Sequence, residues 1–210
     1  NQESLNLEII FFPKFINFLK FMAKGLGGNL SAYEVMWQNF YKWVVSATTN
    51  SIPPLPLESN YYVLVETSGA NQEKDSALFE SLLEEALQNK IIHDAVIPQS
   101  EGERSKLWAI RDDVEQHYQE GPVKMFDVSM PILSMENYIE EVTKQFAEPC
   151  DTYKCIVFGP VWDGNLHLIL VVGSNYIVTI STMTDCIYDP LAAIITAVAA
   201  YHVLGFESNY

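Results

Sequence analysis

The residues best suited to chemistry lie in a short polar stretch between two apolar runs. The stretch Gly159-Pro160-Val161-Trp162-Asp163-Gly164-Asn165-Leu166-His167 follows residues 155–158 and precedes residues 168–172. Both runs are rich in valine, isoleucine, leucine or phenylalanine and too short for helices, so they are predicted to be buried strands. The Asp-Gly pair predicts a tight turn, because glycine tolerates the positive φ that such turns need. We therefore expect Asn165 and His167 on one face of the second strand.

Two interpretations of this polar strand face stay open from spacing alone. It is a binding or catalytic site, or it is an ordinary hairpin whose His167 hydrogen-bonds to the backbone. His202 is a lone histidine in the apolar segment 191–204, which is compatible with a core position as well as with chemistry. Arg111 is followed by acidic residues that could hold it in a surface ion pair, namely Asp112, Asp113 and Glu115.

Composition limits the class of protein. The chain has 210 residues, of which 49% are hydrophobic and 19% are charged, so it is predicted to fold into one domain or two small ones. A net charge of −15 argues against nucleic acid or an anionic membrane surface as the main partner. The three cysteines (Cys150, Cys155 and Cys186) are an odd number without a repeating spacing, which predicts reduced thiols, and the absence of a Cys-x-x-Cys pair argues against a zinc ribbon or thioredoxin-type site. No apolar run reaches the length of a membrane span.

The order of helical and strand patterns predicts an α+β fold. Helices are expected at residues 15–24, 31–45, 74–89, 101–118 and 135–146, and strands at 61–67, 95–97 and 123–130, before the two strands of the polar stretch. This order favours an antiparallel sheet with helices packed on one face. The prolines of residues 52–56 predict a stiff linker. We therefore expect residues 1–56 to form a helical segment and linker, and residues 57–210 to form the α+β domain.

Four blocks of sequence carry a resemblance to a known family. They are residues 30–37 (LSAYEVMW), residues 99–101 with 107–112 (QSE and LWAIRD), residues 126–131 (FDVSMP) and the polar stretch at 159–167. In this order they resemble the C-terminal domain of FAD-linked oxidases, in the group of glycolate oxidase and of D-lactate and D-2-hydroxyglutarate dehydrogenases, within the vanillyl-alcohol oxidase superfamily. The resemblance implies a ferredoxin-like cap domain that binds substrate. It also implies that FAD is held mainly by an N-terminal domain, which we expect to be missing from a fragment that begins at Asn1.

The resemblance implies a function as well as a fold. The chain would be the substrate-binding part of an FAD-dependent enzyme that oxidises a D-2-hydroxy acid to a 2-keto acid. The expected partners are that small acid and the FAD-binding domain, a homo-oligomer stays open, and the expected location is the cytoplasm, with the mitochondrion open. The alternative is a catalytically degenerate relative that serves as a non-enzymatic α+β binding domain.

The resemblance also implies roles for individual residues. Arg111 would clamp the substrate carboxylate, since a guanidinium can hold it with two parallel hydrogen bonds. Asn165 would face substrate and flavin, and His202 would lie near the flavin as the base that takes the hydroxyl proton. The family's divalent metal is doubtful here, because only His167 remains of its three ligands, with Pro160 and Tyr201 at the other two positions.

Two further groups of residues are predicted to be structural. The alternation of apolar side chains with Asp127, Ser129 and Pro131 is typical of a strand. The aromatic cluster of residues 37–43, which comprises Trp37, Phe40, Tyr41 and Trp43, favours a core or lid position over a cofactor site.

Overall fold

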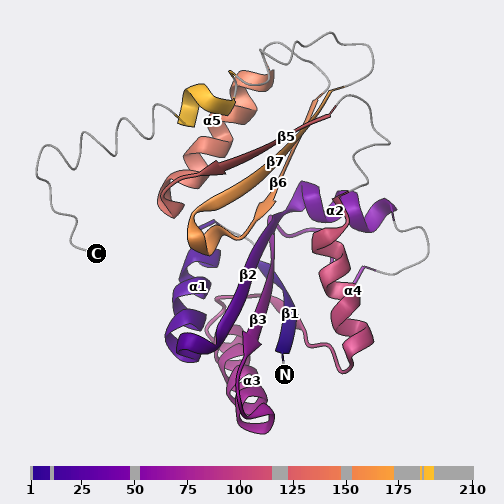
Figure 1. The fold of residues 1–210 in the computed structure, drawn as a ribbon, viewed down its shortest axis with the longest axis vertical. Helices are drawn as coiled ribbons and strands as arrows, with labels where there is room; N and C mark the ends of the chain where they lie inside the picture. Colours follow the sequence, from indigo (N-terminus) through magenta and orange to yellow (C-terminus); the bar gives the residue numbers. More distant parts are fainter. Residues whose placement is uncertain are drawn as a thin grey trace, which may run out of the picture. The chain divides into compact units, whose positions relative to one another are not determined.

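The computed structural model describes residues 2–9, 12–47, 53–114, 123–147, 153–172, 185 and 187–191. The chain divides into two compact units (Figure 1). The first comprises residues 1–116 and 157–163, and the second comprises residues 117–156 and 164–210. Strand β6 (Tyr153–Gly159) contributes residues to both units. Every strand pairing with a described register is antiparallel, and the α+β class predicted from the sequence is confirmed.

The first unit is built on the strand order β4-β1-β3-β2. Its strands are β1 (Gln2–Ile9), β2 (Leu30–Trp37), β3 (Tyr61–Ser68) and β4 (Asp94–Val96). Its helices are α1 (Phe12–Leu26), α2 (Gln38–Ala47), α3 (Gln72–Gln88) and α4 (Glu101–Asp112), with a 3₁₀ turn η1 (Gly27–Asn29) after α1. Strand β2 also pairs with the end of β6, where Val35 lies opposite Gly159.

Helices cover both faces of this sheet, which is more than the single helical layer predicted from the sequence. All seven residues 61–67 of β3 are buried, so the strand is covered on both sides. Tyr33 of β2 points to α1, where its hydroxyl donates a hydrogen bond to the Phe15 carbonyl over 2.6 Å. Glu34, the next residue, points to the opposite face and pairs with Arg111 of α4. Successive side chains of one strand thus contact helices on opposite sides.

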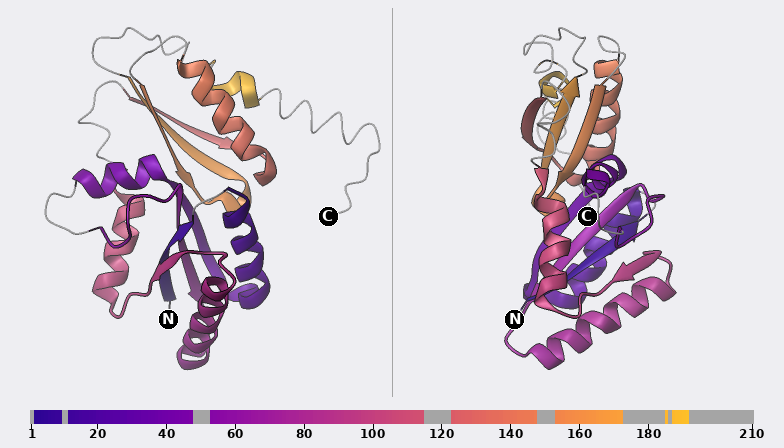
Figure 2. Two further views of the ribbon diagram at one scale, coloured as in Figure 1. Left: turned by 180° about the vertical axis from the view of Figure 1, so that it is seen from behind. Right: turned by 90° about the vertical axis from the view of Figure 1, so that its right-hand side faces the viewer.

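The second unit carries its described helices on one face of its strands (Figure 2). Its strand order is β6-β7-β5, with β5 (Val123–Ser129) and β7 (Asn165–Val172) antiparallel. Helix α5 (Met135–Ala147) follows a 3₁₀ turn η3 (Ile132–Ser134), and its Tyr138 hydroxyl donates to the Ile187 carbonyl over 3.0 Å. The apolar side of the strands faces these helices and includes Phe126 and Leu168.

The turn predicted from Asp163-Gly164 is confirmed. A 3₁₀ turn η4 (Val161–Asp163) connects β6 to β7, and Gly164 has φ +85°. The Met130 amide donates to the Gly164 carbonyl over 2.9 Å, and a Cβ at position 164 would lie 2.8 Å from the Met130 carbonyl oxygen. Both the positive φ and the close backbone approach require glycine.

Three boundaries differ from those predicted. Residues 31–45 are not one helix, because residues 30–37 pair with β3 as strand β2 and helix α2 begins at Gln38. The proline-rich segment does not separate two units, because β1 and β2, which precede it, both pair with β3, which follows it. Helix α4 ends at Asp112, and residues 115–118 of the predicted helix lie outside the described residues.

None of the described helices is both long and apolar enough to cross a membrane.

Candidate functional site

A row of polar side chains lies on one face of the β5–β7 pair in the second unit. The register places Asp127 opposite His167 and Ser129 opposite Asn165. Nδ1 of His167 contacts the Asp127 carboxylate, and the Ser129 hydroxyl donates to the Asn165 side-chain oxygen over 3.3 Å. Strand alternation gathers these four residues on the face opposite Phe126, Val128, Leu166 and Leu168, which are buried. The prediction that Asn165 and His167 share a strand face is therefore confirmed.

The carboxylate beside His167 changes what this imidazole can do. Its partner is the Asp127 side chain, which is 75% exposed, while the His167 side chain is 22% exposed. A carboxylate at Nδ1 fixes the orientation of the ring and therefore the direction in which Nε2 points. The strand alternation predicted for Asp127 is confirmed, since its neighbours Phe126 and Val128 are buried and Asp127 is exposed. Pairing in register, which sequence spacing does not reveal, brings the two residues together.

The second candidate site surrounds Arg111 on α4 in the first unit. Its Nε donates to Glu34 over 3.0 Å, and its Nη1 donates to Asp112 over 3.1 Å. The guanidinium carbon lies 5.5 Å from the centroid of the Phe158 ring, which is a cation–π distance. Of the acidic residues that follow Arg111, Asp112 is thus a partner, while Glu115 lies outside the described residues.

Buried groups from two strands contact the inner side of Arg111. Glu34 of β2 is 8% exposed and Phe158 of β6 is 3% exposed. Phe158 stacks on Phe40 of α2 with ring centroids 4.5 Å apart. A buried carboxylate needs a cationic or hydrogen-bonding partner, so Glu34 and Arg111 stabilise each other's position. The Glu34 carboxylate and the Phe158 ring together fix the position of the guanidinium from its buried side.

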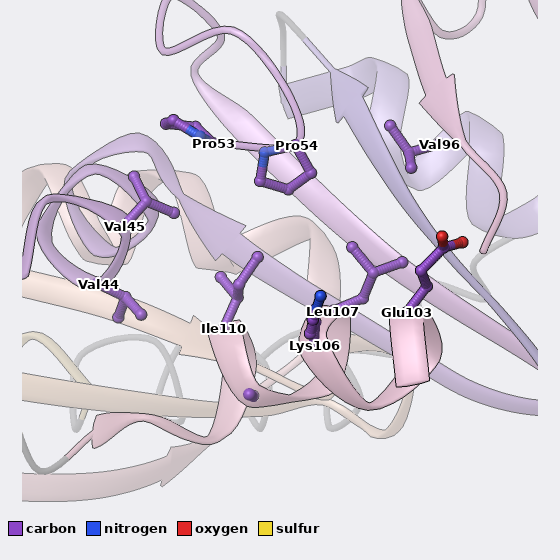
Figure 3. Close-up of a pocket in the computed structure, with 10 residues that line it drawn as sticks. Val44, Val45, Pro53, Pro54, Val96, Glu103, Lys106, Leu107 and Ile110 are labelled. Atoms are coloured by element: carbon purple, nitrogen blue, oxygen red, sulfur yellow. The ribbon is translucent and has the colours of Figure 1, made fainter. Parts of the chain in front are cut away.

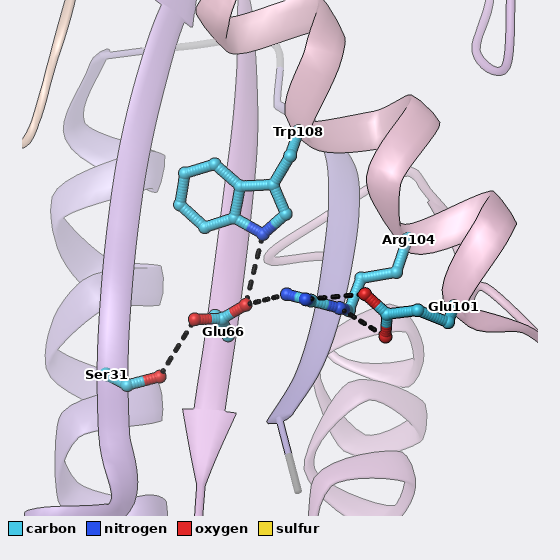
Figure 4. A network of polar contacts seen from close by, with 5 residues as sticks. All are labelled: Ser31, Glu66, Glu101, Arg104 and Trp108. Atoms are coloured by element: carbon cyan, nitrogen blue, oxygen red, sulfur yellow. Dashed lines mark hydrogen bonds and ion pairs between the residues drawn. The ribbon is translucent and has the colours of Figure 1, made fainter.

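A second arginine of α4 belongs to a neighbouring network (Figure 4). Glu66 of β3, which is 5% exposed, accepts hydrogen bonds from Arg104 Nη1 over 2.8 Å, Trp108 Nε1 over 3.0 Å and the Ser31 hydroxyl over 3.4 Å. Arg104 also donates through Nε and Nη2 to Glu101, over 2.9 and 2.7 Å. The hydrogen bonds from Arg104 lower the pKa of the Glu101 carboxyl. This network fastens α4 to the sheet.

An apolar cavity of about 430 Å³ lies elsewhere in the first unit (Figure 3). Its wall comes from α2, the prolines after it, β4 and α4, and includes Val45, Pro54, Val96 and Ile110, with Lys106 and Glu103 also on the lining. No residue of the two candidate sites lines this cavity, so it is separate from the chemistry predicted from the sequence.

The remaining predicted residues lie in different units or outside the described residues. Arg111 belongs to the first unit, whereas Asn165 and His167 belong to the second. His202, Tyr201, Cys150 and Cys186 lie outside the described residues, so the base assigned to His202 stays a prediction. Phe40 and Tyr41 of the aromatic cluster are fully buried, as expected for core residues. Cys155 is a buried thiol, and burial raises its pKa to about 12.

The described residues do not fit the divalent metal of the family. Pro160 stands at one of the three ligand positions and has no donor atom in its side chain, so His167 lacks the ligand that would bind the metal beside it. Within the described ranges, no group of three histidine, cysteine, aspartate or glutamate side chains is arranged to hold a metal ion.

Sequence reasoning did not identify Glu34 or Phe158 as parts of a site. A signal for Glu34 was present, since an acidic residue within an apolar strand must find a partner when the strand is buried. Phe158 carried no such signal, because it resembles any other core phenylalanine.

Residues 1–198 match the family described as FAD linked oxidases, C-terminal domain. The chain is 25% identical over 206 residues to the mitochondrial D-2-hydroxyglutarate dehydrogenase of Arabidopsis thaliana. This alignment covers 96% of this chain and 36% of that protein. It is 27% identical over 185 residues to the enzyme of the same name from Bos taurus. The alignment covers 88% of this chain and 33% of that protein. A solved structure of alkyldihydroxyacetonephosphate synthase has a TM-score of 0.61 at 10% identity, and the match covers 97% of this chain and 42% of that one.

Proposed function

This chain belongs to the FAD linked oxidase C-terminal domain family, and from this premise we propose that it forms the substrate-binding part of an FAD-dependent enzyme that oxidises a D-2-hydroxy acid. The names of the two dehydrogenases similar to it support this proposal. The chain spans only 36% and 33% of their lengths, so the flavin would be held mainly by an N-terminal domain outside this sequence. When bound, the flavin accepts a hydride and the acid becomes a 2-keto acid.

The observation that carries the proposal is the geometry of Arg111. Glu34 occupies Nε and Phe158 lies against the guanidinium, so the plane of the group is fixed from the inside. The edge formed by Nη1 and Nη2 carries one hydrogen bond, to the exposed Asp112. A carboxylate can bind to such an edge with two parallel hydrogen bonds. This edge suits the carboxylate that every 2-hydroxy acid carries.

The polar row of the second unit carries side chains of the kinds that contact hydroxy acids and flavins. The amide of Asn165 can donate to and accept from substrate oxygens or the polar edge of a flavin ring. His167 is held in its orientation by the carboxylate of Asp127. In this proposal His202 remains the base that takes the hydroxyl proton.

The enzyme's location and assembly complete the proposal. The two similar dehydrogenases are named as mitochondrial, which favours the mitochondrion over the cytoplasm predicted from the sequence. The partners would be the small hydroxy acid and the FAD-binding domain, and a homo-oligomer stays open.

Turnover by the full-length gene product tests the proposal. We expect flavin fluorescence after purification and reduction of the flavin by D-lactate, glycolate or D-2-hydroxyglutarate. The paired substitution Glu34→Gln with Arg111→Gln leaves no unpaired buried charge. It should raise KM about 10- to 100-fold, because a bidentate charged contact contributes about 1.5–3 kcal/mol. An intact protein with neither flavin nor turnover would contradict the proposal.

A second candidate function is a non-catalytic binding domain that kept the fold. Pro160 and Trp162, which is 55% exposed, favour it because they stand where the family motif has a histidine and a glycine. The coding sequence upstream of Asn1 separates the two functions. An intact flavin-binding region there supports the enzyme, whereas a start codon near residue 1 supports the binding domain.

A further inference from the structure

The two arginines of α4 differ in how many of their nitrogens are occupied. Arg104 uses Nε and Nη2 on Glu101 and Nη1 on Glu66. Arg111 uses Nε on Glu34 and Nη1 on Asp112, and within the described residues its Nη2 makes no hydrogen bond. The guanidinium of Arg104 is therefore fully committed within the fold, whereas Arg111 keeps one edge half occupied.

We propose that Asp112 holds the place of the substrate carboxylate on Arg111, and that a 2-hydroxy acid displaces it on binding. Asp112 would then be a specificity-determining residue that sets how strongly a carboxylate must bind in order to compete. The inference rests on the proposed role of Arg111 as the substrate clamp. It assigns a function to the residue beside the clamp.

The difference in burial between the two partners of Arg111 supports an exchange at Nη1. The Glu34 side chain is 10% exposed, whereas that of Asp112 is 60% exposed. An exposed ion pair is weak, because water and salt screen it, while a buried carboxylate strongly resists the loss of its partner. An incoming anion would therefore displace Asp112 and leave Glu34 in position.

The position of Asp112 in the chain makes the exchange geometrically simple. It is the last residue of α4, so its side chain can adopt another rotamer without disturbing a following turn of the helix. Asp112 accepts a single hydrogen bond from Arg111 through one oxygen. A substrate carboxylate that spans Nη1 and Nη2 would replace this bond with two, which favours the substrate.

The experiment compares Asp112→Asn with Asp113→Asn in the full-length, flavin-loaded protein. The two substitutions remove the same charge from adjacent residues, but only Asp112 contacts Arg111. The probes for KM and kcat are D-lactate and D-2-hydroxyglutarate, and Kd comes from calorimetric titration of the oxidised protein with the corresponding 2-keto acids, which carry the same carboxylate but no hydride to transfer. We expect Asp112→Asn to lower KM and Kd about 3- to 10-fold with kcat within 2-fold, and Asp113→Asn to change Kd by less than 2-fold.

Three results would overturn the inference, and an unchanged Kd in Asp112→Asn is the first. Equal decreases in both variants would indicate a general charge effect, and an increase of Kd in Asp112→Asn would show that Asp112 assists binding. The variant Glu34→Gln with Arg111→Gln distinguishes failure of this inference from failure of the proposed function. If that variant weakens binding and Asp112→Asn leaves Kd unchanged, only the inference fails. If the double variant binds as tightly as the unchanged protein, the role of Arg111 fails as well.

Discussion

The Glu66–Arg104 pair of the first unit and the Asp127–His167 pair of the second unit combine similar groups in opposite surroundings. Glu66 is 5% exposed and receives hydrogen bonds from three side chains. Asp127 has a side chain that is 75% exposed, on a strand face that carries no described helix. Burial of the Glu66 carboxylate makes the first pair part of the fold, because this charge cannot return to water without unfolding. Exposure leaves the second pair accessible to a ligand.

The largest expected effect comes from breaking the buried pair. Arg104→Ala should lower the free energy of unfolding by about 3–5 kcal/mol, because it leaves Glu66 buried without its cation. Denaturant titration followed by circular dichroism measures the change. The double variant Glu66→Gln with Arg104→Ala should recover part of the loss, since a neutral amide needs no cation. A loss below about 1 kcal/mol in the single variant would mean that the pair does not hold α4 in place.

A smaller effect is expected from the turn that leads into the polar row. Gly164→Ala should cost about 2–3 kcal/mol, because alanine at φ +85° is strained and its Cβ would lie 2.8 Å from the Met130 oxygen. Gly28→Ala is the matched control, since nothing lies within 4 Å of a Cβ at that position. The difference in melting temperature between the two variants measures the effect. Equal melting temperatures would show that the turn tolerates a side chain.

The interior of the second unit should respond to alkaline pH. Burial raises the pKa of Cys155 from 9.0 to about 12, so above pH 9 the unfolded chain binds fewer protons than the folded one. Stability is then unaffected below about pH 9 and falls as the pH rises towards 12, by about 2 kcal/mol at pH 10.5. Denaturant titrations at several pH values should show a steeper fall for the unchanged protein than for Cys155→Ala. If the stability of the two proteins fell in parallel with pH, Cys155 would not be the group responsible for the alkaline loss of stability.

The fold was predictable where apolar periodicity was strong. The strand at residues 61–67 and helix α3 follow directly from such patterns, and the turn follows from a glycine after an aspartate. The segment 31–45 was less predictable, because its aromatic and apolar residues fit a helix as well as a strand followed by a helix. Its true structure depends on pairing with β3, about 30 residues further along the chain.

The candidate sites were predictable only where partners are close in sequence. Asp112 is adjacent to Arg111 and was anticipated as a partner, whereas Glu34 lies 77 residues away. Asp127 and His167 are 40 residues apart, and only the β5–β7 register joins them. Side-chain type indicates which residues need a partner, and the tertiary fold decides which partner they obtain.

The smallest expected effect on stability, and the sharpest test of the comparison, comes from Asp127→Asn. The change should alter the free energy of unfolding by less than about 1 kcal/mol, because the carboxylate is largely exposed. It should still lower kcat/KM of the full-length enzyme about 10-fold, since His167 loses the carboxylate that orients its ring. Glu140→Gln on the exposed surface of α5 removes the same charge and should change neither quantity. If Asp127→Asn destabilised the protein as much as Arg104→Ala and left turnover intact, exposure would not distinguish the two pairs, and the polar row would be structural.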